Sequence, residues 1–271
     1  MAKLPLTKRE QAIPYAKYYY LPLETERPED AAFLNHPLPE EGVLPYERAA
    51  EFFDFDEARL LGGNGYYITK EGRGFTACAV ELPNVTPQMV LWWFSWLNSY
   101  VKRPGTHGNL RYRIWFPPDH WDHCYFDEDD PDAGVCIAES LDLGRGQPRN
   151  NIITLTTDPA AIGISDKVQE RVQREGSALL FGCGHDGAGN PGGMGVNYFK
   201  KTEQGCIWAT CGWGGYTVRD GKVVALPVAA PASEEGIRCE LLHNLLERRQ
   251  LAKFLPELYA EYKDKPLGSD I

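Results

Sequence analysis

The middle of the chain alternates between strand-like segments and turns, and this pattern is the strongest limit on its fold. Strands are predicted over residues 72–82, 109–116, 134–143 and 150–157. In 109–116 and 134–143, apolar and polar residues alternate with the period of a half-buried strand. Helices do not alternate regularly with these strands, which disfavours a parallel sheet. The pattern therefore predicts an antiparallel sheet.

Helical segments flank this region. A helix is predicted over residues 86–101, with Thr86 as its N-cap and a proline in its first turn. A short helix is expected over 164–176. A long helix begins near Ser233 and closes the chain, with a kink or break at Pro256. A sheet wrapped around this closing helix would enclose a cavity against its concave face.

Residues 181–196 contain seven glycines and are predicted to form a mobile loop that could act as a lid. The glycines do not follow the GxGxxG pattern that opens a helix in a dinucleotide-binding unit, so a phosphate-cradling role is disfavoured. The following residues predict a hairpin that turns near 203–205. A further turn is expected at 219–224.

The N-terminal residues, up to about 60, are rich in proline and acidic residues and predict irregular or short helical structure. We divide the chain into an N-terminal arm or small subdomain, residues 1–70, and a main domain, residues 71–271. The arm is expected to pack on the main domain or on a second subunit, which leaves a homodimer open.

The net charge of −10 argues against a nucleic-acid partner and against attraction to anionic lipid. The longest apolar run, residues 89–97, is too short to span a bilayer. Seven cysteines without a CxxC pair, and no apolar signal core, predict reduced thiols in the cytoplasm. Cys206 and Cys211 lack the second pair that a zinc site built from cysteines needs.

His243 and Glu247 lie four residues apart in the closing helix and therefore share one face. Cys239 and Leu246 flank that face, so it is partly apolar and is predicted to point inward. A histidine and a carboxylate one turn apart can bind one metal ion. A surface ion pair would explain the same spacing.

Other candidate ligands come from the strand region. Glu139 shares a strand face with apolar residues, where a charge is costly unless it is paired, protonated or bound to metal. His120 and His123 follow the end of a predicted strand. Two histidines and two carboxylates can hold zinc and leave room for water. A salt bridge from Glu139 to an arginine, and a loop position for His120, are the alternatives.

The segments LRYRIWFPPDH, GVCIAESL and HNLLE, with WWFSWLN upstream, resemble the 2,4-diacetylphloroglucinol hydrolase and phloretin hydrolase family. The resemblance covers roughly residues 75 to 260. It implies an α+β fold of the helix-grip type found in the Bet v 1 pollen allergen. In that fold an antiparallel sheet wraps around a long C-terminal helix, here preceded by a small N-terminal segment.

The resemblance also implies a zinc ion held by two histidines and two glutamates. These ligands fall on His120, Glu139, His243 and Glu247. A tyrosine that contacts substrate in the family falls on Tyr112. The family has an asparagine where this chain has His123, which is a departure. Tyr112 and His123 are our candidates for hydrogen bonding to ring hydroxyls and for proton transfer.

Two further departures concern positions that contact substrate in the diacetylphloroglucinol enzyme of the family. Asn197 stands where that enzyme has a histidine, and Gly212 stands near a tyrosine position. These changes leave the metal ligands intact and favour phloretin or a related acylphloroglucinol as substrate. Asn197 and His185 are the predicted substrate-binding residues, although His185 could equally be a solvated loop histidine.

The activity implied is hydrolysis of the C–C bond between an acyl carbonyl and a phloroglucinol ring in a small aromatic ketone. Conversion of phloretin to phloroglucinol and phloretic acid is favoured, and deacetylation of diacetylphloroglucinol comes next. Three alternatives stay open at this point. They are a non-catalytic carrier of aromatic or apolar ligands with the same fold, a zinc hydrolase of another ketone or an ester, and a purely structural metal site.

Overall fold

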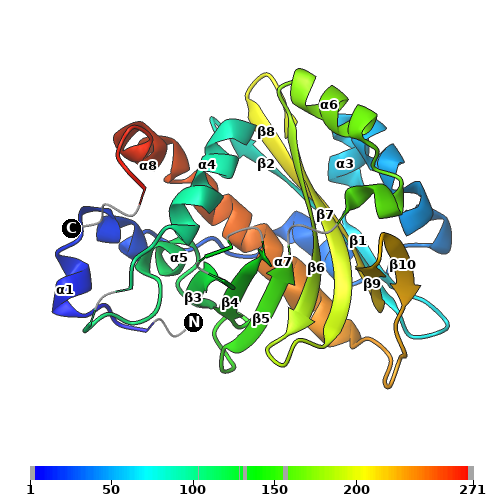
Figure 1. The fold of residues 1–271 in the computed structure, drawn as a ribbon, viewed down its shortest axis with the longest axis horizontal. Helices are drawn as coiled ribbons and strands as arrows, with labels where there is room; N and C mark the ends of the chain where they lie inside the picture. The colour runs from blue at the N-terminus through cyan, green and yellow to red at the C-terminus, as the bar shows by residue number, and fades with distance from the viewer. Residues whose placement is uncertain (1–3, 103, 128, 131–132, 155–157, 268–271) are drawn as a thin grey trace.

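An eight-stranded antiparallel sheet forms the centre of the molecule (Figure 1). The computed structural model describes residues 4–102, 104–127, 129–130, 133–154 and 158–267. In spatial order the strands are β1 (Gly65–Ile68), β2 (Gly74–Pro83), β8 (Gly205–Gly214), β7 (Pro191–Lys201), β6 (Ala178–Asp186), β5 (Arg149–Thr154), β4 (Val135–Glu139) and β3 (His120–Tyr125). A separate hairpin pairs β9 (Tyr216–Arg219) with β10 (Lys222–Ala225). Helices and an antiparallel sheet are thus combined as expected, and the helix-grip assignment stays a prediction.

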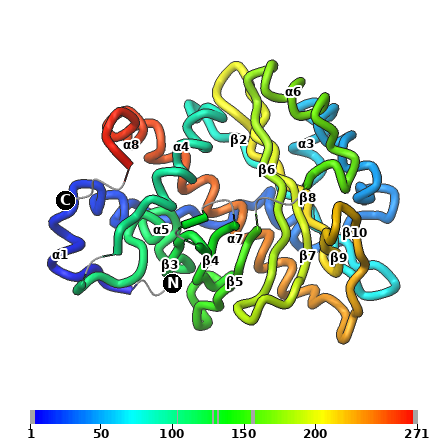
Figure 2. The backbone as a smooth tube through the Cα atoms, in the orientation of Figure 1, coloured from blue at the N-terminus to red at the C-terminus, as the bar shows by residue number. Residues whose placement is uncertain are grey.

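Helices cover both faces of this sheet. The α-helices are α1 (Lys8–Gln11), α2 (Ala31–Leu34), α3 (Glu57–Gly62), α4 (Pro87–Asn98), α5 (Leu110–Trp115), α6 (Asp166–Arg174), α7 (Glu234–Ala252) and α8 (Leu255–Tyr262). Short 3-10 helices cover Pro14–Tyr20, Pro28–Asp30, Glu40–Gly42, Tyr46–Asp54 and Pro159–Ile162. The long helix α7 crosses the sheet and packs against β2, as the orange trace shows in Figure 2.

The predicted helix starts are confirmed. The Thr86 hydroxyl accepts a hydrogen bond from the Met89 amide, and Pro87 is the first residue of α4. The Ser233 hydroxyl accepts from the Gly236 amide at the start of α7. Helix α7 ends at Ala252, and α8 begins at Leu255 with Pro256 in its first turn. Side-chain caps of this kind satisfy backbone donors that a helix start otherwise leaves free.

The prediction of a strand at 109–116 is wrong, because these residues form α5. The Asn109 side chain accepts a hydrogen bond from the Tyr112 amide and caps this helix. The alternation that suggested a strand comes from Arg111 and Arg113, yet both are buried. Arg113 pairs with Glu10 at 2.7 Å. Because a distant partner compensates the charge, the polar positions do not mark a solvent-facing side.

The prediction of a mobile loop or lid at 181–196 is also wrong. Most of this segment belongs to β6 and β7, which pair with each other and turn at residues 187–190. In that turn the Asp186 carboxylate accepts hydrogen bonds from the Ala188 and Asn190 amides. The glycines therefore lie mostly inside the sheet. The hairpin predicted to turn near 203–205 is confirmed by the pairing of β7 with β8.

The other strand predictions are close to the structure. The segment 72–82 corresponds to β2, and 134–143 contains the shorter β4. The segment 150–157 corresponds to β5 up to Thr154, and residues 155–157 lie outside the described residues. The short helix predicted at 164–176 is α6.

Side chains from the two faces of the sheet enter two hydrophobic cores. One core lies between the sheet and α4, α5, α7 and α8, and it includes Trp93, Phe199 and Trp208. The other lies on the opposite face and includes Phe53 and Tyr198. The N-terminal residues contribute to both cores, and β1 pairs with β2. The division of the chain at residue 70 stays a prediction.

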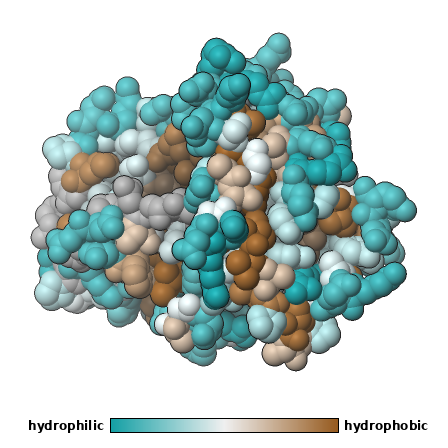
Figure 3. Space-filling view, turned by 45° about the vertical axis from the view of Figure 1, so that its right-hand side comes forward, coloured by the Kyte–Doolittle hydropathy of each residue, from teal (hydrophilic) through white to brown (hydrophobic). Residues whose placement is uncertain are grey.

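The surface view in Figure 3 shows hydrophilic side chains over most of one face, with hydrophobic bands between them. Within the described part of the chain, no helix combines the length and apolar character needed to cross a bilayer.

Candidate metal centre and adjoining cleft

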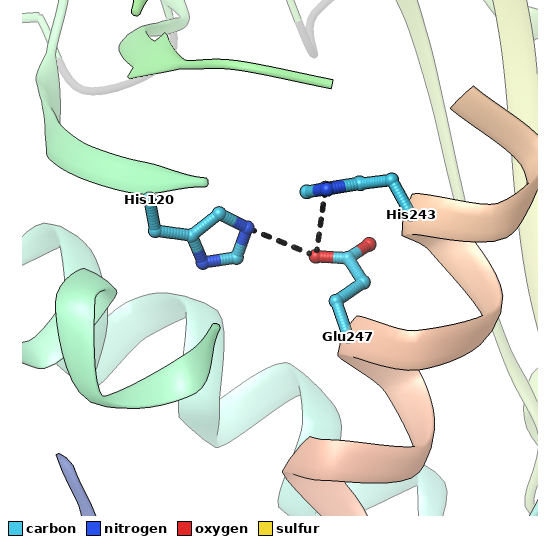
Figure 4. A group of neighbouring side chains, drawn as sticks. All are labelled: His120, His243 and Glu247. Atoms are coloured by element: carbon cyan, nitrogen blue, oxygen red, sulfur yellow. Dashed lines mark ion pairs between the residues drawn. The ribbon is translucent and has the colours of Figure 1, made fainter. Parts of the chain in front are cut away.

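Three buried side chains meet between the sheet and α7 (Figure 4). His120 comes from the first residue of β3, and His243 and Glu247 come from successive turns of α7. The Glu247 Oε2 atom lies 3.3 Å from Nε2 of His120 and 3.6 Å from Nε2 of His243. The three candidate ligand atoms all lie within 4.8 Å of one another. The predicted inward face of the closing helix is therefore observed.

The His120 ring directs its Nε2 atom toward this centre. Its Nδ1 lies 3.2 Å from the carbonyl oxygen of Tyr112. A carbonyl oxygen only accepts, so this contact is a hydrogen bond when Nδ1 carries the hydrogen, and Nε2 is the ring nitrogen that faces the centre. That Nε2 atom is buried and has no hydrogen-bond partner. A buried polar atom of this kind needs an explanation, and coordination of a cation provides one.

Asp119 orients the other imidazole. Its Oδ2 lies 2.7 Å from Nδ1 of His243, which leaves Nε2 of that ring for a metal. The Asp119 carboxylate is completely buried and also accepts hydrogen bonds from the Ser140 hydroxyl and the Gly144 amide. Carboxylates that bind the second nitrogen of a metal-ligating histidine are typical of zinc sites. Sequence reasoning missed Asp119, although an acid directly before a candidate ligand was a usable signal.

The charges around His243 favour a cation. Burial lowers the pKa of His243, but the hydrogen bond to Asp119 and the charges of Glu247 and Glu139 raise it more, to about 9. Burial likewise raises the pKa of Asp119, and its hydrogen bonds, chiefly from His243, bring the net value below its ordinary level. The centre thus attracts positive charge, and its imidazole and carboxylate donors suit a divalent metal ion.

Glu139 lies beside this centre but outside the group of three. It is the register partner of His120 in the pairing of β3 with β4. Its Oε2 accepts a hydrogen bond from the Tyr112 hydroxyl, so the partner is a tyrosine and not the arginine considered above. Burial, followed by the charges of Glu139 and Glu247, raises the pKa of Tyr112 well above its ordinary value. Tyr112 therefore keeps its proton.

Tyr112 packs on His120, and His123 packs on Tyr112. The Tyr112 ring is stacked on the His120 ring, with centroids 3.8 Å apart and planes 5° apart. His123 meets the Tyr112 ring edge-on at 5.0 Å. Burial, and secondarily the charge of His120, lowers the pKa of His123 to about 3. His123 is therefore a neutral imidazole, and its buried Nδ1 has no partner.

A cleft of about 860 Å³ lies between α7 and strands β2, β6, β7 and β8. Glu139 lines this cleft and thus connects it to the metal centre. The two predicted substrate-binding residues, Asn197 and His185, also line it. His185 lies in β6, and its buried Nδ1 has no hydrogen-bond partner. The cleft has the size of a small-molecule site.

Asn197 belongs to a fixed hydrogen-bond network at one end of the cleft. Its Oδ1 accepts from Nε1 of Trp208 at 2.7 Å and from the Thr210 hydroxyl at 2.9 Å. With its oxygen occupied, Asn197 offers its amide nitrogen to a ligand. Arg248 donates to the Thr210 hydroxyl at 2.7 Å and to Oδ1 of Asn244 at 2.8 Å. The helical spacing predicts that Arg248 points away from the inward face of the closing helix. That prediction is wrong, because Arg248 is buried and its guanidinium donates to oxygens of β2 and β8.

Residues 53–260 match the family described as the DAPG hydrolase PhiG domain, and the chain belongs to this family of hydrolases. It is 24% identical over 278 residues to a phloretin hydrolase from Eubacterium ramulus, covering 97% of this chain and 95% of that protein. It is 23% identical over 217 residues to a 2,4-diacetylphloroglucinol hydrolase from Pseudomonas protegens, covering 73% and 68% of the two chains. A 2,4-diacetylphloroglucinol hydrolase from a Pseudomonas species is also 23% identical. The family predicted from the motifs is thus confirmed.

Proposed function

We propose that this protein is a metal-dependent hydrolase that cleaves the C–C bond between an acyl carbonyl and a phloroglucinol ring. Phloretin is the favoured substrate, with phloroglucinol and phloretic acid as products, and diacetylphloroglucinol is the next candidate. The observation that carries the proposal is the convergence of His120, His243 and Glu247 next to a cleft. The names of the relatives support the choice of substrate class. We further propose the helix-grip fold as the family architecture that forms this cleft.

The reaction needs a carbon leaving group that is poor in an ordinary arene. A ring with three hydroxyls can take a keto form when a ring carbon is protonated, and the bond to be broken then joins two carbons of a β-diketone. Water adds to the acyl carbonyl, the C–C bond breaks, and the ring leaves as an enolate that a proton converts to phloroglucinol. The acyl group leaves as a carboxylic acid. The site must therefore activate water, polarise a carbonyl and move protons.

The donors in the structure fit a zinc ion. His120, His243 and Glu247 would hold it, and we assign Glu139 as the fourth ligand on the family resemblance. When bound, zinc supplies Lewis acidity that polarises a carbonyl and makes water acidic near neutral pH. Asp119 keeps the His243 ring in the orientation that presents Nε2. Asp119 would thereby present one ligand nitrogen to the ion.

The remaining polar residues position the substrate in this proposal. Tyr112 stays protonated, so its hydroxyl can donate to an oxygen of the ring or of the carbonyl. His123 stays neutral, so it can accept or donate a single hydrogen bond. Asn197 and His185 line the cleft on its sheet side, where they would contact the ligand.

The test is to incubate the purified protein with phloretin and to follow phloroglucinol by chromatography, with a chelated sample alongside. We expect release that stops on chelation and returns when zinc is restored. Full activity in a protein verified to be metal-free would refute the metal-dependent mechanism. Absence of release from both phloretin and diacetylphloroglucinol would refute the substrate class.

A non-catalytic carrier is the second candidate, because a cleft of this size can hold an aromatic ligand without chemistry. A carrier predicts stoichiometric binding of phloretin, recovery of the ligand intact, and no stoichiometric metal. Metal analysis of the purified protein separates the two candidates.

A further inference from the structure

The side of the cleft formed by the sheet lacks side chains over two successive rows. One row crosses β6, β7 and β8 at register-paired glycines, and a second row lies two residues further along each strand. The six positions are Gly182, Gly195 and Gly212, followed by Gly184, Gly193 and Gly214. All six line the cleft, and we call them the glycine floor. The residues between them, such as Cys183 and Met194, enter the core on the opposite face.

The packing of the protein itself does not require glycine throughout this floor. A Cβ atom built on Gly184 meets its nearest neighbour, Cδ1 of Ile153, at 3.6 Å, which is an ordinary contact. A Cβ on Gly195 meets the Cys211 carbonyl oxygen at 3.2 Å, a closer but not prohibitive approach. Both glycines have backbone angles that other residues can adopt. Glycine in a strand interior costs stability, so the open space above the floor calls for another explanation.

Arg248 provides an independent indication of a ligand. Its side chain is only 2% exposed, it lines the same cleft, and its buried Nε has no hydrogen-bond partner. The partners of its other nitrogens are carbonyl and neutral side-chain oxygens, including the Cys78 carbonyl at 3.0 Å. In the described ranges it forms no ion pair with a carboxylate. Its guanidinium also lies over the Trp208 ring, 4.7 Å from the centroid, and its charge acts on Glu240, which lines the same cleft. A buried guanidinium that has no direct carboxylate partner favours a ligand rich in oxygen acceptors.

These features divide the cleft into two regions. Arg248, Asn197 and Thr210 form a polar end, where the Asn197–Thr210 register pair lies directly beside the Gly195–Gly212 pair. The glycine floor continues from there as a flat surface of peptide groups. A single hydroxylated ring with an acetyl group would fill little of a cleft of about 860 Å³. An extended ligand with a second flat ring matches both regions.

We infer that the glycine floor binds a flat aryl ring on the acyl side of the substrate, while the polar end receives the oxygen-bearing phloroglucinol ring. The glycine floor is then the subsite that makes an acyl chain ending in an aromatic ring a better fit than an acetyl group. This inference rests on the proposed function, which already favours phloretin, and it assigns the surface that binds the ring on the acyl side.

The test compares two probes, phloretin and monoacetylphloroglucinol, on variants of one floor position. Gly184→Leu places a side chain over the floor, and Gly184→Ala adds one methyl group. We expect Gly184→Leu to lower kcat/KM for phloretin by about tenfold or more and to leave kcat/KM for monoacetylphloroglucinol within about twofold. The kcat/KM of Gly184→Ala for phloretin should lie between the values of the wild type and of Gly184→Leu. Gly62→Ala in α3 is the matched control, because a Cβ there meets nothing within 4 Å and Gly62 does not line this cleft.

If Gly184→Leu lowers kcat/KM equally for both probes, or leaves kcat/KM for phloretin unchanged, the inference is overturned. Thermal melting of each variant checks that the fold is retained. If the wild-type protein releases phloroglucinol from neither probe, the proposed function fails. The affinity of each variant for phloretin is then measured by calorimetric titration. Weaker phloretin binding by Gly184→Leu would then support the glycine floor as a ring-binding surface. Equal affinity, or no binding by the wild type, would overturn it.

Discussion

Asp119 accepts a hydrogen bond from Nδ1 of His243 at 2.7 Å and leaves the other nitrogen of that ring, Nε2, facing Glu247. This pair connects β3, through the residue just before its start, with the closing helix. We predict that Asp119→Asn weakens metal binding by about 10- to 100-fold, because the amide no longer stabilises the ligating tautomer. Competition against a chromophoric chelator measures this affinity directly.

Ser140→Ala is the matched control for this prediction. It removes one hydrogen bond to Asp119 but leaves the carboxylate and its contact with His243 in place. Its metal affinity should stay close to that of the wild type. An Asp119→Asn variant with wild-type metal affinity would show that Asp119 has no role in orienting the ligand.

Metal removal should destabilise the folded protein. A ligand present at a hundred times its dissociation constant stabilises the native state by about 2.7 kcal/mol. We therefore expect chelation to lower Tm and added zinc to restore it. The Tm of the Glu247→Gln variant should change much less on chelation or on addition of zinc, because the substitution removes the one carboxylate of the three-residue group. Equal melting shifts in both proteins would contradict metal binding at this centre.

His123 is predicted not to contribute an ionisation to the activity between pH 5 and 8. Burial and the neighbouring His120 hold its pKa at about 3, so the ring is already neutral throughout that range. His123→Asn, which restores the residue implied by the family resemblance, should give a pH–rate profile of unchanged shape. Loss of one limb of the profile in this variant would show that His123 titrates during catalysis.

The buried pair of Asp30 and Arg249 should make stability fall in acid. Two 2.7 Å contacts join the guanidinium to the carboxylate. Burial raises the pKa of Asp30, but the hydrogen bonds from Arg249 and Arg27 lower it more, and the net pKa lies below its ordinary value. A lowered folded-state pKa contributes stability above about pH 4, and that contribution is lost as pH falls through the folded value.

Asp30→Asn should therefore cost roughly 3 kcal/mol at pH 7 and progressively less below pH 4, as measured by urea unfolding. Glu257→Gln, which breaks the exposed pair with Lys17, is the control and should change stability by less than about 1 kcal/mol. If Asp30→Asn lowers the free energy of unfolding by the same amount at pH 7 and pH 3, the assigned role of the ion pair is contradicted.

Local signals in the sequence predicted local structure well. Thr86 and Ser233 cap the helices they were expected to cap, and the spacing of His243 and Glu247 put both side chains on the buried face of α7. Such features depend on residues within one or two turns of each other. The hairpin between β7 and β8 was predictable for the same reason.

The errors came from interactions between distant residues. Arg113 looked like a solvent-facing strand residue because nothing near it in sequence reveals that Glu10 compensates its charge. The glycines of 181–196 suggested a loop because glycine is common in loops, whereas here their neighbours in the sheet are further glycines. Asp119 was missed, and the orientation of Arg248 was predicted wrongly, because their functional partners lie on other elements.

On our proposal, the glycine floor also affects how readily this chain can change its substrates. One base change converts any glycine codon into an alanine codon, and the backbone at Gly184 accepts alanine without rearrangement. The metal ligands lie on other residues, so the volume above the floor can shrink in steps of one methyl group while the chemistry is preserved. On our proposal, descendants of this chain could pass from large to small acyl groups through a series of active intermediates.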